Sequence, residues 1–365
     1  MSITVGVFWD TATINGISWK YSVSGGKAKI TGASPVSGYI KIPSEIDGYS
    51  VTSIGSKAFA DCGSLTSVVI GNSLTSIGDM AFADCDSLKE FVVSPNNPDY
   101  KSVNGLLLSK DGKTLIAGVN GDITIPDSVT SIGGGAFRGC SNLTSVVIPD
   151  SVTSIGDRAF AGCHSLTSVV IPNSVTSIGD RAFAWCGSLT SVVIPDSVTS
   201  IGGGAFLGCC SLTSVVIPDS VESIGGGAFW GCCSLTSVVI PDSVTSIGDN
   251  AFSSCGSLTS VVIGNSVTSI GVRAFAWCGR LMSVVIPNSV TSIESEAFWG
   301  CRSLTEAIFL GNAPKSVGVF RGYIFVDCPE GLVIKVKRGT TGWDGDYTST
   351  ALPDKWRGYP IRYCE

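Results

Sequence analysis

A 23-residue repeat dominates the sequence and constrains its fold more than any other feature. Phenylalanine and cysteine recur with this period, and each cysteine follows a phenylalanine by three residues. One longer step, between Phe82 and Phe137, interrupts the series. The repeated phenylalanines are Phe59, Phe82, Phe137, Phe160, Phe183, Phe206, Phe229, Phe252, Phe275 and Phe298. A period of about 20 to 50 residues is typical of a solenoid, in which each unit buries its apolar face against the next unit.

Within one unit, the sequence predicts a strand, a bend and a short helical turn. Leu166, Val169 and Ile171 follow the pattern L-x-x-V-x-I of the strand in a leucine-rich repeat. A Pro-Asn or Pro-Asp pair then ends the strand, because proline fixes φ and the polar side chain bonds nearby backbone. Residues 181–186 carry their Phe and Cys at i, i+3, a spacing that places both on one helix face. We therefore expect an α/β repeat solenoid: a right-handed, curved leucine-rich-repeat array with short parallel strands on the concave face and helical turns on the convex face.

The regions that flank and interrupt the repeats predict the domain organisation. Residues 1–50 alternate apolar and polar side chains, which predicts a β-rich cap that shields the first repeat. The array extends over residues 51–310, with a hairpin insertion at about 94–121 that is marked by Ser-Pro-Asn-Asn-Pro and by an Asp-Gly turn. Residues 311–365 are expected to form a last repeat and a C-terminal cap, and Phe325 and Cys328 keep the repeat spacing there.

Composition argues against several classes of function. The chain has 23 basic and 29 acidic side chains, a net charge of -6 and a pI near 4.9, which argues against binding to a phosphate backbone. No apolar run approaches the roughly 18 residues that span a bilayer, and the first residues lack the basic and apolar regions of a secretory leader. We expect no nucleic-acid partner, no transmembrane segment in this chain, and a monomer.

The candidate catalytic and metal-binding residues have the wrong spacing for chemistry. The repeated cysteines supply one thiol per unit, without a C-x-x-C pair or a histidine partner for zinc, so we interpret them as buried free thiols. His164 is the single histidine, so neither a Ser-His-Asp arrangement nor a histidine metal site can be assembled. Asp196 and Asp219 belong to a column of turn residues that imitates the paired carboxylates of a glycosidase, but parallel stacking creates such pairs automatically. We expect no enzyme activity, no metal and no cofactor.

Four tryptophans fall on the outer turns: Trp185, Trp230, Trp277 and Trp299. Exposed aromatic side chains there can contact a glycan or a protein. Because neighbouring members are one or two repeats apart, a single aromatic cage is a poor explanation, and we expect packing between outer turns instead.

Two cysteines break the pattern of one thiol per unit. Cys210 and Cys233 each follow the repeated cysteine directly, at a position where other units have His164, Gly187 or Arg302. Because this position accepts polar groups, we expect it to lie at the surface. Successive parallel strands are about 5 Å apart, which is within the Cα separation of a disulfide. A Cys210–Cys233 disulfide and a pair of exposed free thiols both stay open.

The second residue of each Val-Val-Ile triplet is expected to point away from the core, because side chains alternate along a strand. These valines would form an apolar stripe on the concave face, flanked by the serines two residues earlier. The residues of this candidate binding surface are Val147, Val170, Val193, Val216, Val239, Val262, Ser168, Ser191, Ser214 and Ser237. A large exposed apolar patch is typical of an interaction site. The alternative is that valine occurs there only because it favours strands.

The unit L-x-x-V-x-I-P-x-x-V-x-x-I-G-x-x-A-F-x-x-C closely resembles the BspA-like leucine-rich repeats of the 23-residue treponemal type. The resemblance covers residues 51–310, and residues 96–116 and 340–361 are similar to the insertion and C-terminal cap of that family. It implies a surface or secreted protein of bacteria or protists that adheres to host matrix proteins or to cells without catalysis. We accordingly expect a protein ligand, such as an extracellular-matrix or host-cell glycoprotein, and an extracellular or cell-surface location. The alternative is a cytoplasmic scaffold for protein–protein interactions.

Overall fold

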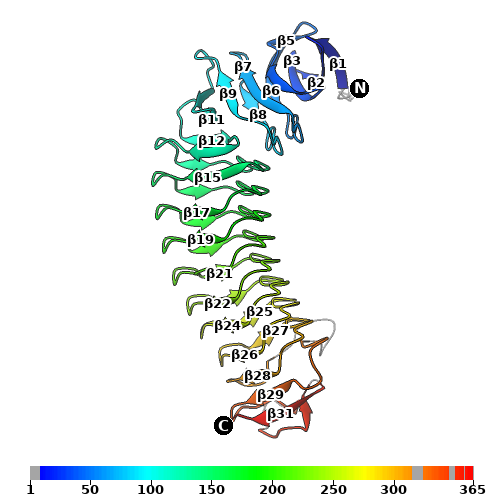
Figure 1. The fold of residues 1–365 in the computed structure, drawn as a ribbon, viewed down its shortest axis with the longest axis vertical. Helices are drawn as coiled ribbons and strands as arrows, with labels where there is room; N and C mark the ends of the chain where they lie inside the picture. The colour runs from blue at the N-terminus through cyan, green and yellow to red at the C-terminus, as the bar shows by residue number, and fades with distance from the viewer. Residues whose placement is uncertain (1–8, 315–323, 345–349, 357, 365) are drawn as a thin grey trace, which may run out of the picture. The chain divides into compact units, whose positions relative to one another are not determined.

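The computed structural model describes residues 9–314, 324–344, 350–356 and 358–364. The chain divides into two compact units, Met1–Leu166 and Thr167–Glu365. All regular elements of the described residues are β-strands, and successive repeats stack as rungs within each unit (Figure 1). The repeats therefore form a β-solenoid.

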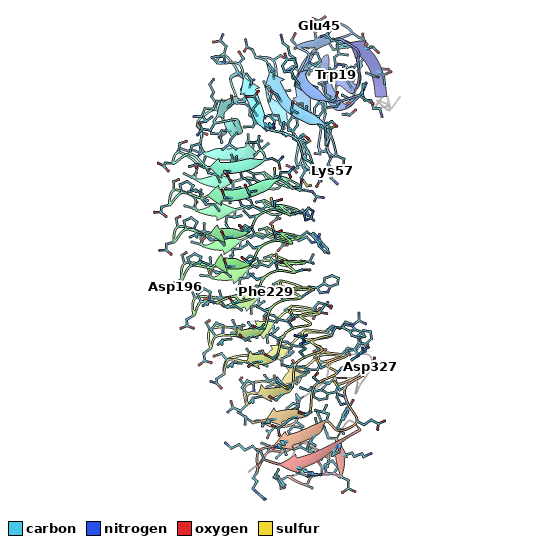
Figure 2. All side chains as sticks on the ribbon, viewed as in Figure 1. Trp19, Glu45, Lys57, Asp196, Phe229 and Asp327 are labelled. Carbon is cyan, nitrogen blue, oxygen red and sulfur yellow. The ribbon has the colours of Figure 1, made fainter. Side chains whose placement is uncertain are left out.

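The first unit begins with a curled sheet. Its strands are β1 (Trp9–Ile14), β2 (Ile17–Ser24), β3 (Lys27–Ser34), β5 (Glu45–Ile46), β6 (Tyr49–Ile54) and β8 (Ser76–Ile77). Their order is β1-β2-β3-β6-β5, and β8 also pairs with β6. Trp19 lies inside this sheet, 1% exposed, and its ring meets Phe59 of the first repeat edge-on at a centroid distance of 6.2 Å (Figure 2). Trp19 therefore joins the sheet to the core of the first repeat.

The rest of the first unit contains the insertion and the repeats on either side of it. Its strands are β4 (Gly38–Lys41), β7 (Leu65–Ile70), β9 (Glu90–Val93), β10 (Tyr100–Val103), β11 (Leu106–Ser109), β12 (Thr114–Ala117), β13 (Gly121–Thr124), β14 (Ser131–Ile132), β15 (Leu143–Val147) and β16 (Ser154–Ile155). β4, β7 and β9 are parallel, whereas β10, β11 and β12 form an antiparallel meander that includes the predicted turn at Asp111-Gly112. β12 then pairs in parallel with β14, and β14 with β16. The insertion thus supplies the strand on which the regular ladder resumes.

Gly118 marks the junction between the insertion and the regular repeats. A Cβ atom at Gly118 would lie 2.0 Å from the ring of Phe137. Phe137 is fully buried, so its ring packs directly on the bare backbone of Gly118. On the other side of the insertion, Phe82 packs edge-on against Phe91 of β9, with ring centroids 5.0 Å apart. The missing side chain at Gly118 therefore makes room for the phenylalanine column to restart.

The second unit contains the most regular repeats. Its strands are β17 (Ser168–Val170), β18 (Ser177–Ile178), β19 (Ser191–Val193), β20 (Ser200–Ile201), β21 (Ser223–Ile224), β22 (Ser237–Val239), β23 (Ser246–Ile247), β24 (Ser260–Val262), β25 (Ser269–Ile270), β26 (Ser283–Ile286), β27 (Ser292–Ile293), β28 (Glu306–Phe309), β29 (Val333–Val336), β30 (Lys355–Trp356) and β31 (Tyr359–Tyr363). The short Ser-Ile strands β18, β20, β21, β23, β25 and β27 form a parallel ladder in this unit, in which Ser177 faces Ser200. On the Val-Val side, β17 pairs with β19 and β22 with β24, and β26, β28, β29, β31 and β30 form a C-terminal sheet.

One strand that the repeat pattern predicts is absent from the described part of the second unit. Residues 212–217 carry the L-x-x-V-x-I pattern, but they do not form a regular strand. The amide nitrogen of Thr213 lies 3.4 Å from the carbonyl oxygen of Thr190, and that of Thr236 lies 3.3 Å from the carbonyl oxygen of Thr213. These bonds exceed the usual N–H···O distance of about 2.9 to 3.0 Å. Strand pairing is therefore weakened locally, although the side chain of Val215 stays buried.

Stacked phenylalanine rings form the core of the second unit. From Phe183 to Phe298, neighbouring ring centroids are 5.2 to 5.5 Å apart and the rings lie within 9° of parallel. Phe325 continues the column at 5.6 Å from Phe298. Figure 2 labels Phe229 in this column and Asp196 at the edge of a rung, where its side chain is exposed. Each aromatic pair adds about 0.5 to 1.5 kcal/mol to the stabilisation that burial provides.

Three further aromatic rings cover the C-terminal end of this core. Phe309, Trp343 and Trp356 meet one another edge-on, with centroid distances of 5.1 to 5.5 Å. The buried indole N–H of Trp343 donates to the hydroxyl oxygen of Thr340 at 2.8 Å. The three rings therefore shield the apolar end of the stack from solvent, and the buried indole N–H of Trp343 keeps a hydrogen-bond partner.

The expected helical turns are wrong: the described residues contain no helix. Between Gly179 and Cys186, alternate amides donate to the carbonyl three residues earlier, and the amides between them donate to the next repeat. Phe183, for example, donates to Ala205 at 2.8 Å. An α-helix would require its amides to bond four residues back within the same segment. The segment is instead a series of tight turns that adds a further hydrogen-bonded ladder to the solenoid.

Left-handed residues prevent these turns from winding into a helix. Arg181 has φ 56° and Trp185 has φ 63°, two residues before and two residues after the repeated phenylalanine. The equivalent residues of the next repeat, Gly204 and Gly208, have φ 63° and 72°. The left-handed conformation costs about 1–2 kcal/mol for a residue with a side chain. Stacking between repeats therefore overrides a local preference at Arg181 and Trp185.

Replacing Phe229 by alanine tests the stacked core. Phe229 stacks on both neighbours and is fully buried, so Phe229→Ala is expected to lower the free energy of unfolding by about 3–5 kcal/mol. Urea unfolding followed by circular dichroism measures the loss. Trp230→Ala is the matched control, because that adjacent side chain is 48% exposed and should cost much less. Equal losses from the two variants would contradict a core that depends on the phenylalanine column.

Gly208→Ala and Gly231→Ala separate backbone strain from side-chain collision. The two glycines have φ 72° and 73°, so the backbone term is expected to cost about 1–2 kcal/mol in each variant. At Gly208 a new Cβ atom would also lie 2.5 Å from the ring of Trp185, whereas at Gly231 the nearest atom is 3.7 Å away. Gly208→Ala should therefore have a lower melting temperature than Gly231→Ala. Adding Trp185→Ala to both variants should reduce this difference in melting temperature. Identical melting temperatures for the two glycine variants would rule out tight packing of Trp185 on Gly208.

Candidate binding surface

Six exposed valines form a column in the second unit, which we name the valine face: Val170, Val193, Val216, Val239, Val262 and Val285. Their side chains are between 42% and 75% exposed. The valine that precedes each one is buried, as Val169 at 3% exposure illustrates. The alternation of side chains along each rung therefore leaves one valine in solvent and one in the core. In the first unit, Val147 is likewise 58% exposed.

Serine hydroxyls flank the valine face. Ser168, Ser191, Ser214 and Ser237 are exposed, each two residues before a valine of the face. In the β17–β19 pair, Ser168 faces Ser191 and Val170 faces Val193. Each repeat between Leu166 and Ile263 carries the segment L-T-S-V-V-I, which contains no charged side chain. The surface is therefore a neutral strip of methyl and hydroxyl groups.

Charged groups appear at the C-terminal end of this strip. Glu306 of β28 lies in register with Ser283 of β26, and it forms an ion pair with Lys335 of β29. Sequence reasoning did not identify this pair, because Glu306 and Lys335 belong to a degenerate repeat and to the expected C-terminal cap. In the first unit, Asp122 occupies the corresponding position and accepts hydrogen bonds from Thr144 and Ser145 at 2.6 and 2.8 Å.

The repeated cysteines form a second column, which lies inside the solenoid. The thiol of Cys255 donates to the carbonyl oxygen of Phe229 at 3.3 Å, and Cys278 donates in the same way to Phe252. Burial raises the pKa of Cys255 to about 12, because a thiolate would lose its hydration there. Cys255 and Cys278 are buried thiols without a disulfide, and they satisfy backbone carbonyls. No group of three His, Cys, Asp or Glu side chains suitable for a metal ion occurs among the described residues.

Cys210 and Cys233 lie outside this column. Both are exposed, and their Sγ atoms are 3.5 Å apart. The structure therefore brings together the two cysteines that the sequence singled out, as neighbouring thiols.

The tryptophans of the outer turns behave in two ways. Trp277 and Trp299 are in contact, with ring centroids 4.8 Å apart, and Arg273 and Arg302 cover the Trp299 and Trp277 rings respectively. The indole N–H of Trp299 donates to Asp327 at 2.8 Å. This pair confirms packing between outer turns. The two arginines were not identified from the sequence, because their contacts depend on the tight turns.

Trp185 and Trp230 are more exposed, at 58% and 48%. Trp185 covers Gly208 of the next repeat, since a Cβ atom there would meet its ring. The outer tryptophans therefore do not form one aromatic cage.

The described residues include no helix with the length and apolar character that crossing a bilayer requires.

The BspA-type leucine-rich-repeat family model matches the chain in six copies, over residues 39–103, 120–232 and 199–331. These matches cover more than half of the chain. The protein therefore belongs to the family of proteins with BspA-type leucine-rich repeats, and its β-solenoid is a leucine-rich-repeat fold. No curated protein matches the sequence.

Solved structures include similar chains. A leucine-rich repeat protein from Eubacterium ventriosum is 22% identical over 77% of this chain and 92% of that chain, with a TM-score of 0.53. A leucine rich cell surface protein from Faecalibacterium prausnitzii is 27% identical over 98% of this chain and 95% of that chain, with a TM-score of 0.44. A leucine-rich repeat protein from Bacteroides ovatus is 23% identical over 97% and 100%, with a TM-score of 0.48. The Eubacterium structure shares the fold of stacked repeats.

Alkaline unfolding tests the burial of the cysteine column. The pKa of Cys255 is about 12 in the folded protein, whereas an unperturbed thiol has a pKa of about 8.5. Above about pH 8.5 the unfolded chain loses this proton while the folded chain keeps it, so stability is complete below that pH and falls as the pH rises toward 12. Cys255→Ala should reduce the slope of the fall in urea unfolding between about pH 8 and 11. Ser253→Ala, at a buried serine, is the control; an unchanged slope in Cys255→Ala would contradict the effect.

Proposed function

We propose that this chain is a non-catalytic protein-binding protein that uses the valine face, with its flanking serines, as its binding surface. The observation that carries the proposal is the column of valines with 42% to 75% of their side chains in solvent. Full burial of a valine side chain stabilises a complex by about 1.5 kcal/mol or more. A partner that covers several neighbouring rungs therefore gains apolar contact at regular intervals.

The strand preference of valine is the competing explanation, and the exposed threonines argue against it. Thr176 and Thr199 are exposed residues next to the Ser-Ile ladder. Threonine is β-branched and favours strands as valine does, but it carries a hydroxyl group. The repeat therefore has a polar alternative for exposed positions and still places valine on one face. Exposed apolar patches of this kind are typical of interaction sites.

The proposal extends to the type of partner and the location. The ligand is a protein, such as an extracellular-matrix or host-cell glycoprotein, and the chain acts in adhesion outside the cell or at its surface. We further propose that the monomeric chain forms a right-handed, curved array with the valine face on the concave side, and that residues 1–50 and 311–365 cap the repeats of 51–310. Membership of the BspA-type family supports this assignment. Recovery of the protein only from the cytoplasm of its source cells would favour an intracellular scaffold instead.

Val193→Glu with Val216→Glu tests the binding surface. The two substitutions place charges on neighbouring rungs, where a bound partner would have to desolvate them. Saturable binding of the purified wild-type chain to immobilised fibronectin or fibrinogen is expected, and the double variant should bind at least about tenfold more weakly, which corresponds to about 1.4 kcal/mol. Surface plasmon resonance measures both affinities.

Thr176→Glu with Thr199→Glu is the matched control, because it adds the same two charges away from the valine face. The chain already has an exposed glutamate, Glu222, at the equivalent position of the next repeat. This control should bind like the wild type, and circular dichroism should show all three proteins folded. Equal affinity of the valine double variant and the wild type would move the site to another surface. If the wild type binds neither fibronectin nor fibrinogen, both are rejected as ligands.

A further inference from the structure

Cys210 and Cys233 form the one place in the described second unit where two exposed thiols lie on successive rungs. Each follows a buried cysteine of the repeat directly. Other repeats have His164, Gly187, Gly256, Gly279 or Arg302 at this position. The pair is therefore a local departure from the repeat, and neither the phenylalanine core nor the valine face needs it.

The backbone holds the two cysteines at a fixed separation. The carbonyl oxygen of Cys210 accepts a hydrogen bond from the amide of Ser234 at 3.1 Å, and that of Cys233 accepts one from Ser257 at 3.2 Å. The first bond joins the rungs of the two cysteines directly, and the second joins the rung of Cys233 to the next rung. Adjacent strands in such ladders are about 4.8 Å apart, which lies within the Cα separation of about 4.4–6.8 Å found in disulfides.

The two thiols already point toward each other. Their Sγ atoms are 3.5 Å apart, and both thiols donate to the carbonyl oxygen of Gly231, at 3.3 Å from Cys210 and 3.2 Å from Cys233. A disulfide requires an S–S distance of about 2.05 Å. At the strand spacing that is typical of such ladders, rotation of the two side chains brings the sulfur atoms closer together.

The neighbouring buried thiols provide an internal comparison. Cys209 and Cys232 also lie on successive rungs, but both are fully buried. Their thiols donate to the carbonyl oxygens of Phe183 and Phe206 at 3.2 and 3.3 Å. Thiol–disulfide exchange requires a thiolate that the oxidant can reach. A soluble oxidant therefore reaches Cys210 and Cys233 and does not reach Cys209 and Cys232.

We propose that Cys210 and Cys233 are a redox site that forms a reversible disulfide across two rungs by exchange with low-molecular-weight disulfides such as oxidised glutathione. The thiolate of one cysteine attacks a sulfur of the small disulfide, which releases one small thiol and leaves a mixed disulfide. The second cysteine then attacks the protein sulfur and releases the second small thiol. The two protein thiols are oxidised, the small disulfide is reduced to two thiols, and the two protons pass to these thiols.

Peptide mapping of the native protein tests this proposal. The reduced, folded chain is incubated with oxidised glutathione and then unfolded in N-ethylmaleimide to block every remaining thiol. Trypsin and glutamyl endopeptidase then cleave after Arg181, Glu222 and Arg273, so that Cys210 and Cys233 fall in different peptides. The expected product is a disulfide-linked pair of peptides, residues 182–222 and residues 223–273. Dithiothreitol should separate the two peptides. The oxidised protein itself should be lighter than the reduced protein by the mass of two hydrogens.

Serine variants identify the cysteines in the link. Cys210→Ser and Cys233→Ser should each abolish the joined peptide and leave a single glutathione adduct on the remaining exposed thiol of the pair. Cys209→Ser should keep the joined peptide. The proposal is overturned if the wild type yields the two peptides only as separate maleimide or glutathione adducts. It is equally overturned if the joined peptide persists in Cys210→Ser.

Discussion

Hydrogen bonding between successive rungs at the tight turns is the constraint on which the rest of the solenoid depends. The amide of Phe183 donates to Ala205 of the next repeat, and the amide of Trp185 donates to Leu207. Amides that bond across rungs are not available for a helix, so the backbone must turn tightly and adopt positive φ at two positions per repeat. This geometry places each phenylalanine ring above the previous ring. It also brings buried thiols such as those of Cys255 and Cys278 within reach of a phenylalanine carbonyl.

The phenylalanine core and the valine face both follow from the same stacking of repeats. Because every repeat is held in register with its neighbour, any side chain that recurs with the period becomes a column. Apolar columns inside the solenoid give the phenylalanine core, and the exposed valines give the valine face. A column contains a local feature only where one repeat carries a different residue from the others. Examples are the exposed thiols of Cys210 and Cys233 and the contact between Trp277 and Trp299.

Much of this organisation could be predicted from the sequence, because the period fixes which residues stack. The buried phenylalanines, the free buried thiols and the exposure of residues such as Val193 all follow from periodicity and side-chain alternation. The helical turns could not be rejected in the same way. Arg181 and Trp185 give no indication of positive φ, since that conformation is usually associated with glycine and is imposed here by the neighbouring rung. The 3.5 Å approach of the two exposed thiols likewise depends on side-chain rotamers.

The fit of Phe137 on Gly118 has a consequence for how the chain finds its alignment during folding. Because the repeats are nearly identical, a rung that pairs one repeat too early or too late would bury almost the same set of side chains. Compact misaligned states that are close in energy to the native state are a general source of kinetic traps in repeat proteins. The contact between Phe137 and the bare backbone of Gly118 has no equivalent in the regular repeats, because a side chain at that glycine would collide with the ring. The contact at the insertion therefore distinguishes the native register of the following repeats from misaligned registers.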